Sequence, residues 1–285
     1  MWRLLFSPFA DGPTNMAVDE AILLAVAEGH ALPTLRFFGW VPPCLSLGYA
    51  QSIADVDLER LHVLGWGLVR RPTGGRAILH TDELTYSIIA PMTEPRVLGG
   101  VVESYRQLSA GLLRGLEILG LQVRADKKAD DRRPTTDDSK HSAVLSNPPS
   151  AVSNPVCFEV PSDYEITAGD KKLLGSAQVR KRGVVLQHGT LPLTGDLTRI
   201  CQALQFESDE ARRNARTRVQ QRATNVVEVC RREVTWAEAA AAMARGFAEA
   251  LGLSFSESGL SAWEQKQAAK LREEKYAAEG WNCRT

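Results

Sequence analysis

The sequence predicts an α+β fold in which short mixed strands lie between groups of helices. Two long segments, at about residues 14–29 and 102–120, repeat apolar residues every three or four positions, as amphipathic helices do. Between and after them, short runs of β-branched and aromatic residues are broken by glycine and proline, which is typical of strands and turns. Because these strands do not alternate regularly with helices, a doubly wound dinucleotide-binding fold is not expected.

Composition indicates an ordinary globular protein. The chain has 285 residues, of which 44% are apolar and 24% are charged, so it can bury a large core. We expect one catalytic domain over residues 1–285. The 34 basic residues balance 34 acidic ones, which argues against non-specific binding of nucleic acid.

The cysteines and the amino-terminal residues point to the cytoplasm. Five cysteines without a C-x-x-C pair are unlike a secreted disulfide framework and indicate reduced thiols: Cys44, Cys157, Cys201, Cys230 and Cys283. The first residues lack the long apolar region of a signal peptide, and no apolar run is long enough for a membrane span. We therefore expect a cytoplasmic protein without a membrane partner.

The first half of the chain reads as helix, strands and helix. Thr14 is the expected cap of an amphipathic helix through NMAVDEAILLAVAEG, with Gly29 as its end. PTLRFFGW and CLSLGYA are expected strands, VDLERLHVLG a helix, and GLVRRPTGGRAILHTDELTYSIIA three strands joined by turns. The second long helix ends near Gly120.

The second half begins with a change of composition. Residues from about 126 to 155 combine charges, serine and proline without an apolar period, so we expect a mobile surface loop there. Strands follow in CFEVPSDYEIT and KKLLGSAQVRKRGVVLQHGTLPL, the latter with a hairpin turn at Lys181, Arg182 and Gly183. The last third is helical, including EVTWAEAAAAMARGFAEALG and residues 261–278.

The adjacent glycines Gly74 and Gly75 permit two interpretations. They can form a tight hairpin turn, or a loop whose amide groups approach a ligand closely. The neighbouring Arg70, Arg71 and Arg76 favour a phosphate-bearing partner, although basic residues on a strand are often its solvated face.

Cys157 and Lys172 are candidates for chemistry in the third quarter of the chain. A lone cysteine is most often a small buried hydrophobe, and a lysine beside another lysine is often exposed. Strand alternation places Lys172 and Leu174 on one face, and Gly175 and Ser176 allow close backbone approach. A lysine near a thiol would favour the thiolate and polarise a carbonyl.

Two histidines, His80 and His188, lie on expected strands beside polar residues. Neither has a second ligand at metal-binding spacing, so no metal site is expected. A structural and a catalytic role are equally open for each histidine.

Several segments together resemble a known family. RRPTGGRAILHTDELTYS is similar to the arginine and double-glycine signature of the biotin/lipoate protein ligase and transferase family, and GDKKLLGSAQVRKRGVVLQHGTLPL to its lysine-bearing signature. NMAVDEA, LRFFGWVPPCLSLGYAQ and LSAWEQKQAAKLREEKYAAEGWN also resemble family elements. The resemblance implies the α+β catalytic domain of biotin and lipoate ligases, with mixed sheets flanked by helices and an acyl tunnel between them.

Within the family, the T-G-G-R-A-x-L-H form and the cysteine opening C-F-E resemble the cysteine-dependent octanoyltransferases. This resemblance implies that Cys157 is the nucleophile and that Lys172 contacts the acyl carbonyl. The sequence departs from the family pattern at Thr81, where aspartate is common. The next residue, Asp82, is an aspartate. The implied substrate-binding residues are Arg70, Arg71, Thr73, Gly74, Gly75, Arg76, His80, Gly175, Ser176, Ala177 and His188.

The expected activity is transfer of an octanoyl group from acyl carrier protein to a lysine of a lipoyl-domain protein, such as glycine cleavage H protein, through a cysteine thioester. Such a transfer requires no cofactor, ATP or metal. Two alternatives stay open: an ATP-dependent lipoate ligase that uses Arg70, Arg71 and Lys172, and a non-catalytic protein that binds acyl groups or carriers.

Overall fold

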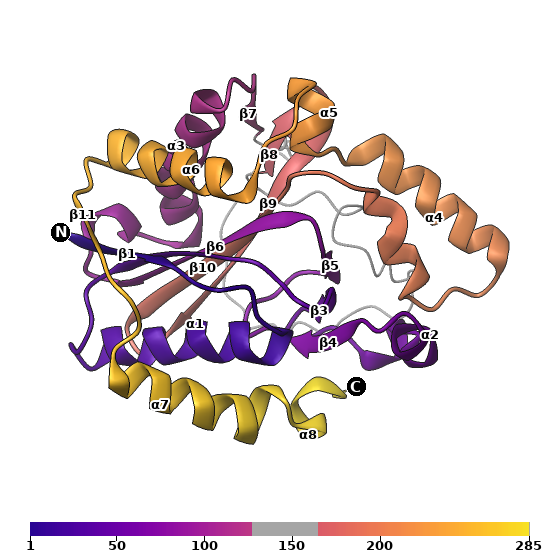
Figure 1. Cartoon of the computed structure of the whole chain (residues 1–285), viewed down its shortest axis with the longest axis horizontal. Helices are drawn as coiled ribbons and strands as arrows, with labels where there is room; N and C mark the ends of the chain where they lie inside the picture. Colours follow the sequence, from indigo (N-terminus) through magenta and orange to yellow (C-terminus); the bar gives the residue numbers. More distant parts are fainter. Residues whose placement is uncertain (127–164, 285) are drawn as a thin grey trace, which may run out of the picture.

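The computed structural model describes residues 1–126 and 165–284, which build two sheets and the helices that cover them (Figure 1). The larger sheet has eight strands in the order β11-β1-β2-β6-β10-β9-β8-β7. β1 is parallel to both its neighbours, and the other pairs are antiparallel. The bounds are β1 Trp2–Phe6, β2 Thr34–Phe38, β6 Glu83–Pro91, β7 Arg124–Asp126, β8 Glu165–Ala168, β9 Lys171–Lys181, β10 Val184–Pro192 and β11 Phe255–Glu257. This mixed architecture confirms the expected α+β class.

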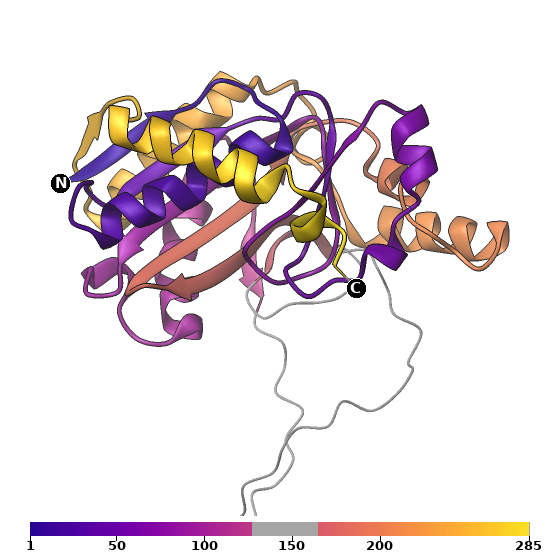
Figure 2. The ribbon, with the colours of Figure 1, turned by 90° about the horizontal axis from the view of Figure 1, so that it is seen from below.

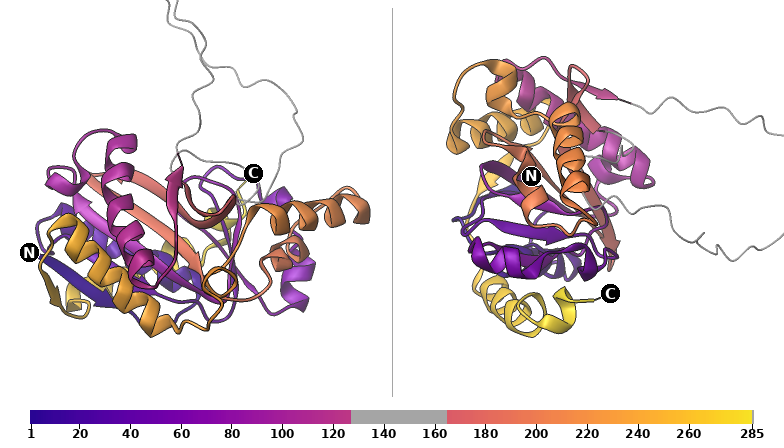
Figure 3. Two further views of the ribbon diagram at one scale, coloured as in Figure 1. Left: turned by 90° about the horizontal axis from the view of Figure 1, so that it is seen from above. Right: turned by 90° about the vertical axis from the view of Figure 1, so that its right-hand side faces the viewer.

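Helices cover both faces of this sheet (Figure 3). On one face α3 and α6 pack together over the main hydrophobic core, and on the other α1 lies against the sheet with α7 beside it (Figure 2). The helix bounds are α1 Gly12–Ala27, α2 Leu58–Val63, α3 Val101–Ile118, α4 Asp209–Arg222, α5 Val226–Cys230, α6 Trp236–Leu251, α7 Ala262–Leu271 and α8 Glu279–Asn282, with a π-helical turn at Arg272–Tyr276.

The smaller sheet corrects one expectation about the glycines. It has the order β4-β3-β5, with bounds β3 Cys44–Leu47, β4 Gly67–Arg70 and β5 Ile78–His80. β4 and β5 each pair with β3, from opposite sides, and not with each other. The hairpin interpretation of Gly74 and Gly75 is therefore wrong, because the loop that carries them crosses over β3.

Helix α1 differs from its prediction in two ways. Its cap is Asp11, whose carboxylate accepts a hydrogen bond from the backbone N–H of Thr14 at 2.8 Å, so Thr14 is not the cap. The helix is also not amphipathic, because it is enclosed between the sheet and α7 and buries Asp19 and Glu20 along with its apolar residues. Gly29 has a φ of 74°, which fits its predicted role at the helix end.

The two ends of strand β9 confirm one prediction and contradict another. Arg182 and Gly183 both have positive φ and join β9 to β10 in a two-residue hairpin, as the sequence indicates. Near Lys172 the β8–β9 register shifts by a residue. Lys172 consequently lines a cavity while Leu174 lies in the main core, so the prediction that they share a face is wrong.

The expected polar loop, apart from Asp126 at the end of β7, lies outside the described residues, as does Cys157. Within the described ranges, no helix is long and apolar enough to cross a membrane.

Candidate active site

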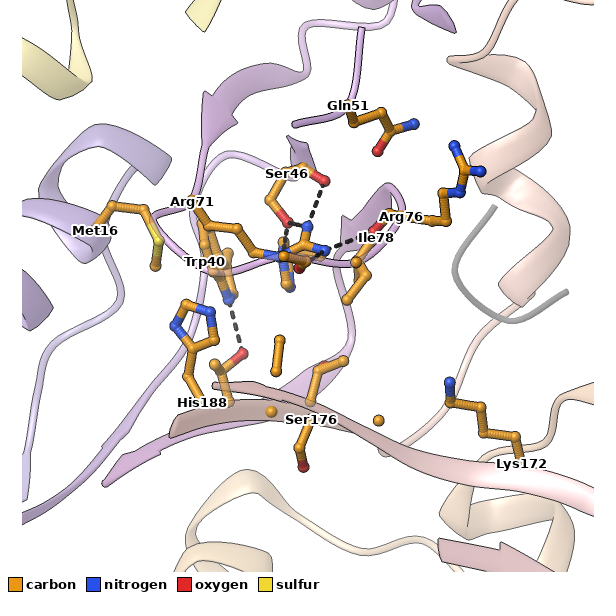
Figure 4. A pocket seen from close by; sticks show the side chains of 18 of the residues that line it. Met16, Trp40, Ser46, Gln51, Arg71, Arg76, Ile78, Lys172, Ser176 and His188 are labelled. Carbon is orange, nitrogen blue, oxygen red and sulfur yellow. Dashed lines mark hydrogen bonds between the residues drawn. The ribbon is translucent and has the colours of Figure 1, made fainter. Parts of the chain in front are cut away.

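A cavity of about 460 Å³ lies between the larger sheet and the smaller one (Figure 4). Its floor comes from β9 and β10, and its roof from β3 and the loop that joins β4 to β5. Lys172 and His188 stand at opposite ends of the floor, and Arg71 lies above it. The predicted site residues that line the cavity are Arg71, Gly74, Gly75, Arg76, His80, Lys172, Gly175, Ser176, Ala177 and His188.

The roof loop is held by its carbonyl groups. One nitrogen of the Arg71 guanidinium donates to the carbonyl oxygens of Gly74 at 2.9 Å and Arg76 at 2.7 Å. The carbonyl of Thr73 accepts from the backbone N–H of Tyr49 at 2.8 Å. Over the described ranges, the N–H groups of Gly74, Gly75 and Arg76 have no acceptor. The loop can therefore donate hydrogen bonds to a carbonyl or phosphate oxygen in the cavity.

Gly48 allows this loop to approach β3, and we expect Gly48→Ala to disrupt it. A Cβ atom at Gly48 would lie 1.9 Å from the carbonyl oxygen of Gly75, and both partners are backbone, so the loop must move. Displacement of this kind typically lowers turnover about a hundredfold. Steady-state kinetics would measure the loss, with Gly259→Ala as control because, in the described part of the chain, no heavy atom beyond its chain neighbours lies within 4 Å of the added methyl. If Gly48→Ala turned over as fast as the wild type, the position of the loop would not matter for catalysis.

His80 is the centre of a chain of hydrogen bonds on the roof side. Its Nδ1 lies 2.5 Å from a carboxylate oxygen of Glu83, and its Nε2 lies 2.7 Å from the hydroxyl of Ser46. Arg71 donates to that hydroxyl at 3.1 Å. Trp40 stacks on the imidazole, with ring centroids 3.9 Å apart. His80 is thus held by Glu83, Ser46 and Trp40, and Ser46 links it to Arg71.

His188 has a similar environment on the floor. Its Nε2 lies 2.6 Å from the hydroxyl of Thr73, and its Nδ1 lies 3.3 Å from a carboxylate oxygen of Asp19. Burial lowers the pKa of His188, although Asp19 opposes this effect. Histidine in this setting is neutral at pH 7.

Lys172 is buried at the far end of the floor. Its ammonium group donates to the carboxylate of Glu165 at 2.7 Å. A methyl group at Gly175 would lie 3.0 Å from the lysine Cε, so glycine leaves room for the lysine side chain. Gly189 allows a different close approach, because its Cβ would lie 2.6 Å from the carbonyl oxygen of Gly175. Glycine there lets β10 lie close to β9 in the cavity floor.

Two of the implied substrate-binding residues lie outside the cavity lining. Thr73 belongs to the roof loop, but its hydroxyl contacts His188 and it is not part of the cavity lining. Arg70 is fully buried and donates to backbone carbonyls of the Gly48–Gln51 segment and of the carboxy-terminal segment, residues 281–284. Its guanidinium therefore supports the cavity wall from behind.

Thr81 and Asp82 form a separate contact. Arg199 donates to the Thr81 hydroxyl at 2.9 Å and pairs with the Asp82 carboxylate. Neither residue lines the cavity, so the departure at Thr81 changes a contact outside it.

The cysteines of the described ranges are also outside the cavity lining. Cys44 and Cys201 are buried, Cys230 is half-buried and Cys283 is exposed. Burial raises the pKa of the Cys44 thiol. In the same ranges no cluster of histidine, cysteine or carboxylate side chains could hold a metal.

The carboxylates that hold the histidines and the lysine are not among the site residues that the sequence predicts. Glu83 follows His80 by three residues in LHTDE, across the turn between β5 and β6, and Asp19 lies in NMAVDEA. Glu165 precedes the lysine signature without any pattern of its own. Only the fold brings Asp19 to His188, since 169 residues separate them.

Comparison with known proteins identifies the class to which this fold and cavity belong. The profile of the lipoyl protein ligase A/B catalytic domain matches residues 11–248, and the chain belongs to this family. It is an acyltransferase enzyme, so the non-catalytic alternative is wrong. The expected family and fold are confirmed.

Relatives of this chain are similar over nearly their whole length. An octanoyltransferase LipM from Symbiobacterium thermophilum is 41% identical, with 99% of this chain and 98% of that protein covered. LipM from Kyrpidia tusciae is 42% identical over the same shares. A lipoate-protein ligase A structure with bound ATP has a TM-score of 0.76 at 26% identity, covering 99% of this chain and 98% of that one. A putative lipoate protein ligase from Thermoplasma acidophilum with bound lipoic acid has a TM-score of 0.74 at 27% identity, with the same coverage.

Proposed function

We propose that this acyltransferase moves an octanoyl group from an acyl carrier protein to a lysine of a lipoyl-domain protein, such as glycine cleavage H protein, through a thioester on Cys157. The observation that carries the proposal is the identity of about 40% with proteins named octanoyltransferase, which extends over nearly all of both chains.

The cavity suits an acyl chain that ends in a reactive carbonyl. Met16, Trp40 and Ile78 supply apolar wall, and each buried CH₂ of an acyl chain contributes about 0.8 kcal/mol. The Lys172 ammonium supplies positive charge for an oxyanion, and the roof-loop N–H groups that have no acceptor among the described residues supply hydrogen bonds.

The proposed reaction has two steps. In the first, the Cys157 thiolate attacks the thioester carbonyl of the donor and a new C–S bond forms. The C–S bond to the carrier breaks, and the carrier thiolate leaves and takes up the proton that Cys157 gave up on ionising. In the second, the neutral amine of the acceptor lysine attacks this enzyme thioester. The C–N bond of the amide forms, the C–S bond to Cys157 breaks, and the proton lost by the amine is taken up by the leaving Cys157 thiolate.

The placement of the other cysteines supports Cys157 as the nucleophile. Cys44 and Cys201 are buried in hydrophobic clusters, and neither Cys230 nor Cys283 lines the cavity. Cys157 also precedes Glu165 in the sequence, and Glu165 holds the Lys172 ammonium.

The rival function is ATP-dependent ligation, which the likeness to the ATP-bound ligase favours. The two functions differ in what they need. A transferase gains one octanoyl mass from octanoyl-carrier protein without ATP, and neutral hydroxylamine removes it as it removes thioesters. A ligase modifies its acceptor only when free acid and ATP are supplied. Mass spectrometry of the enzyme and of a lipoyl domain, with and without ATP, decides between them.

Lys172→Ala is expected to slow formation of the acyl-enzyme about a hundredfold, because it removes a positive charge beside the developing oxyanion. Lys171→Ala is the matched control. That neighbouring lysine is half-buried and donates to the backbone of Gln220, outside the cavity lining. Single-turnover acylation would measure both. Equal acylation rates for the two variants would show that Lys172 does not take part in the reaction.

A further inference from the structure

The NMAVDEA segment contributes no residue to the proposed chemistry except Met16, yet its polar side chains are buried. Asp19 is completely buried on α1, and Arg36 of β2 donates to one of its carboxylate oxygens at 2.7 Å. Arg36 also donates to the side chain of Asn15 at 2.9 Å and to the hydroxyl of Ser7 at 2.8 Å. Burying an ion pair this deeply costs free energy, which suggests that the Asp19 carboxylate has a second function.

The second carboxylate oxygen of Asp19 faces the cavity floor. It lies 3.3 Å from Nδ1 of His188, whose Nε2 lies 2.6 Å from the hydroxyl of Thr73. Burial opposes ionisation of Asp19, but Arg36 and His188 outweigh it and hold the pKa of the carboxyl below its usual value. A charged carboxylate only accepts hydrogen bonds, so Nδ1 carries the proton. Nε2 is then an acceptor, and the Thr73 hydroxyl donates to it.

We propose that Asp19 is a positioning residue that fixes the tautomer and orientation of His188, so that His188 can hold Thr73 and the roof loop over the acyl carbonyl. This inference rests on the proposed function, because the loop is proposed to donate hydrogen bonds to the acyl carbonyl. Thr73 directly precedes Gly74 and Gly75, whose N–H groups have no acceptor across the described ranges. A shift of Thr73 would therefore shift both donors.

The roof loop then has two supports of the same chemical kind. Glu83 and Ser46 contact the two ring nitrogens of His80, and the Ser46 hydroxyl accepts from Arg71 at the start of the loop. Asp19 orients His188, which accepts from Thr73 inside it. Each support is a carboxylate, an imidazole and a hydroxyl in series, and the loop is held both at its start and at its centre.

The kinetic test uses a matched pair of substitutions at Thr73. Valine keeps the shape but lacks the hydroxyl, whereas serine keeps the hydroxyl. We expect Thr73→Val to lower kcat for octanoyl transfer at least tenfold with little change in KM for the donor, because the apolar walls are intact. Thr73→Ser should stay within about twofold of wild type. Wild-type kcat for the valine variant, or equal losses in both, would overturn the positioning role.

The tautomer is tested by ¹⁵N NMR of the His188 ring at neutral pH, which needs no substrate. We expect a protonated Nδ1 and a bare Nε2 in the wild type, and loss of this preference in Asp19→Asn, in which Arg36 retains Ser7 and Asn15 as acceptors. A protonated Nε2 in the wild type would overturn the inference. Since this measurement is independent of turnover, it still tests Asp19 if octanoyl transfer itself is not found.

Discussion

Replacement of Cys157 by serine is expected to leave a folded protein whose octanoyl transfer is reduced by about four orders of magnitude. The thioester route requires a thiol that is partly ionised at neutral pH and that leaves again when an amine attacks. A serine hydroxyl is far less ionised and would leave a stable ester. Intact-protein mass spectrometry after incubation with octanoyl-carrier protein should show one added octanoyl group in the wild type and none that hydroxylamine releases in the variant.

The other cysteines provide the controls for this experiment. Cys283→Ser and Cys230→Ser change thiols that are exposed and half-buried, so both variants should be labelled like the wild type. Cys44 is a poor rival because burial raises the pKa of its thiol. If Cys157→Ala transfers octanoyl at the wild-type rate, or if transfer begins only with ATP and free acid, the enzyme is an ATP-dependent ligase and not a thioester transferase.

The second large effect concerns stability. Arg70→Met is expected to lower the free energy of unfolding by roughly 3–5 kcal/mol, because several buried carbonyl groups lose a charged donor at once. Arg70 donates to the carbonyls of Gly48 at 3.0 Å, Trp281 at 3.1 Å and Asn282 at 2.9 Å, among others. Denaturant unfolding monitored by tryptophan fluorescence would measure the change.

Arg213→Met is the matched control for Arg70, because Arg213 is exposed on α4. Its free energy of unfolding should stay within about 0.5 kcal/mol of wild type. If Arg70→Met is as stable as this control and binds acyl substrate less well, Arg70 contacts the ligand after all.

The sequence is informative about which residues meet in the cavity because the two signatures each form continuous wall. Residues around Gly74 make the roof, and the strand from Lys172 to Ala177 makes the floor. The two signatures contain the contact between Thr73 and His188 that joins roof to floor, but not the distant partners that support the two walls. Asp19 and Arg70 act through partners 169 and 212 residues away, and no local pattern records such contacts.

The errors in the predicted fold have the same origin. Periodicity in α1 predicts one buried face, but the sheet and α7 enclose the helix, so its polar residues are buried with their own partners. Gly74 and Gly75 read as a hairpin turn because adjacent strands usually pair, whereas β3 lies between the two strands here. The β8–β9 register shifts by one residue near Lys172, which interrupts the alternation of side chains along β9. Lys172 and Leu174 therefore do not share a face as predicted.

The contacts of Arg70 also bear on how the protein matures during synthesis. Residues 281, 282 and 284 supply acceptors for its guanidinium, although Arg70 itself is made early. A chain still lacking these residues would have to bury that charge without them, so the wall formed by Ala50 and Gln51 cannot reach its final form on the ribosome until they emerge. Nascent chains of the enzyme would then carry an unfinished cavity wall until residues 281–284 have left the exit tunnel.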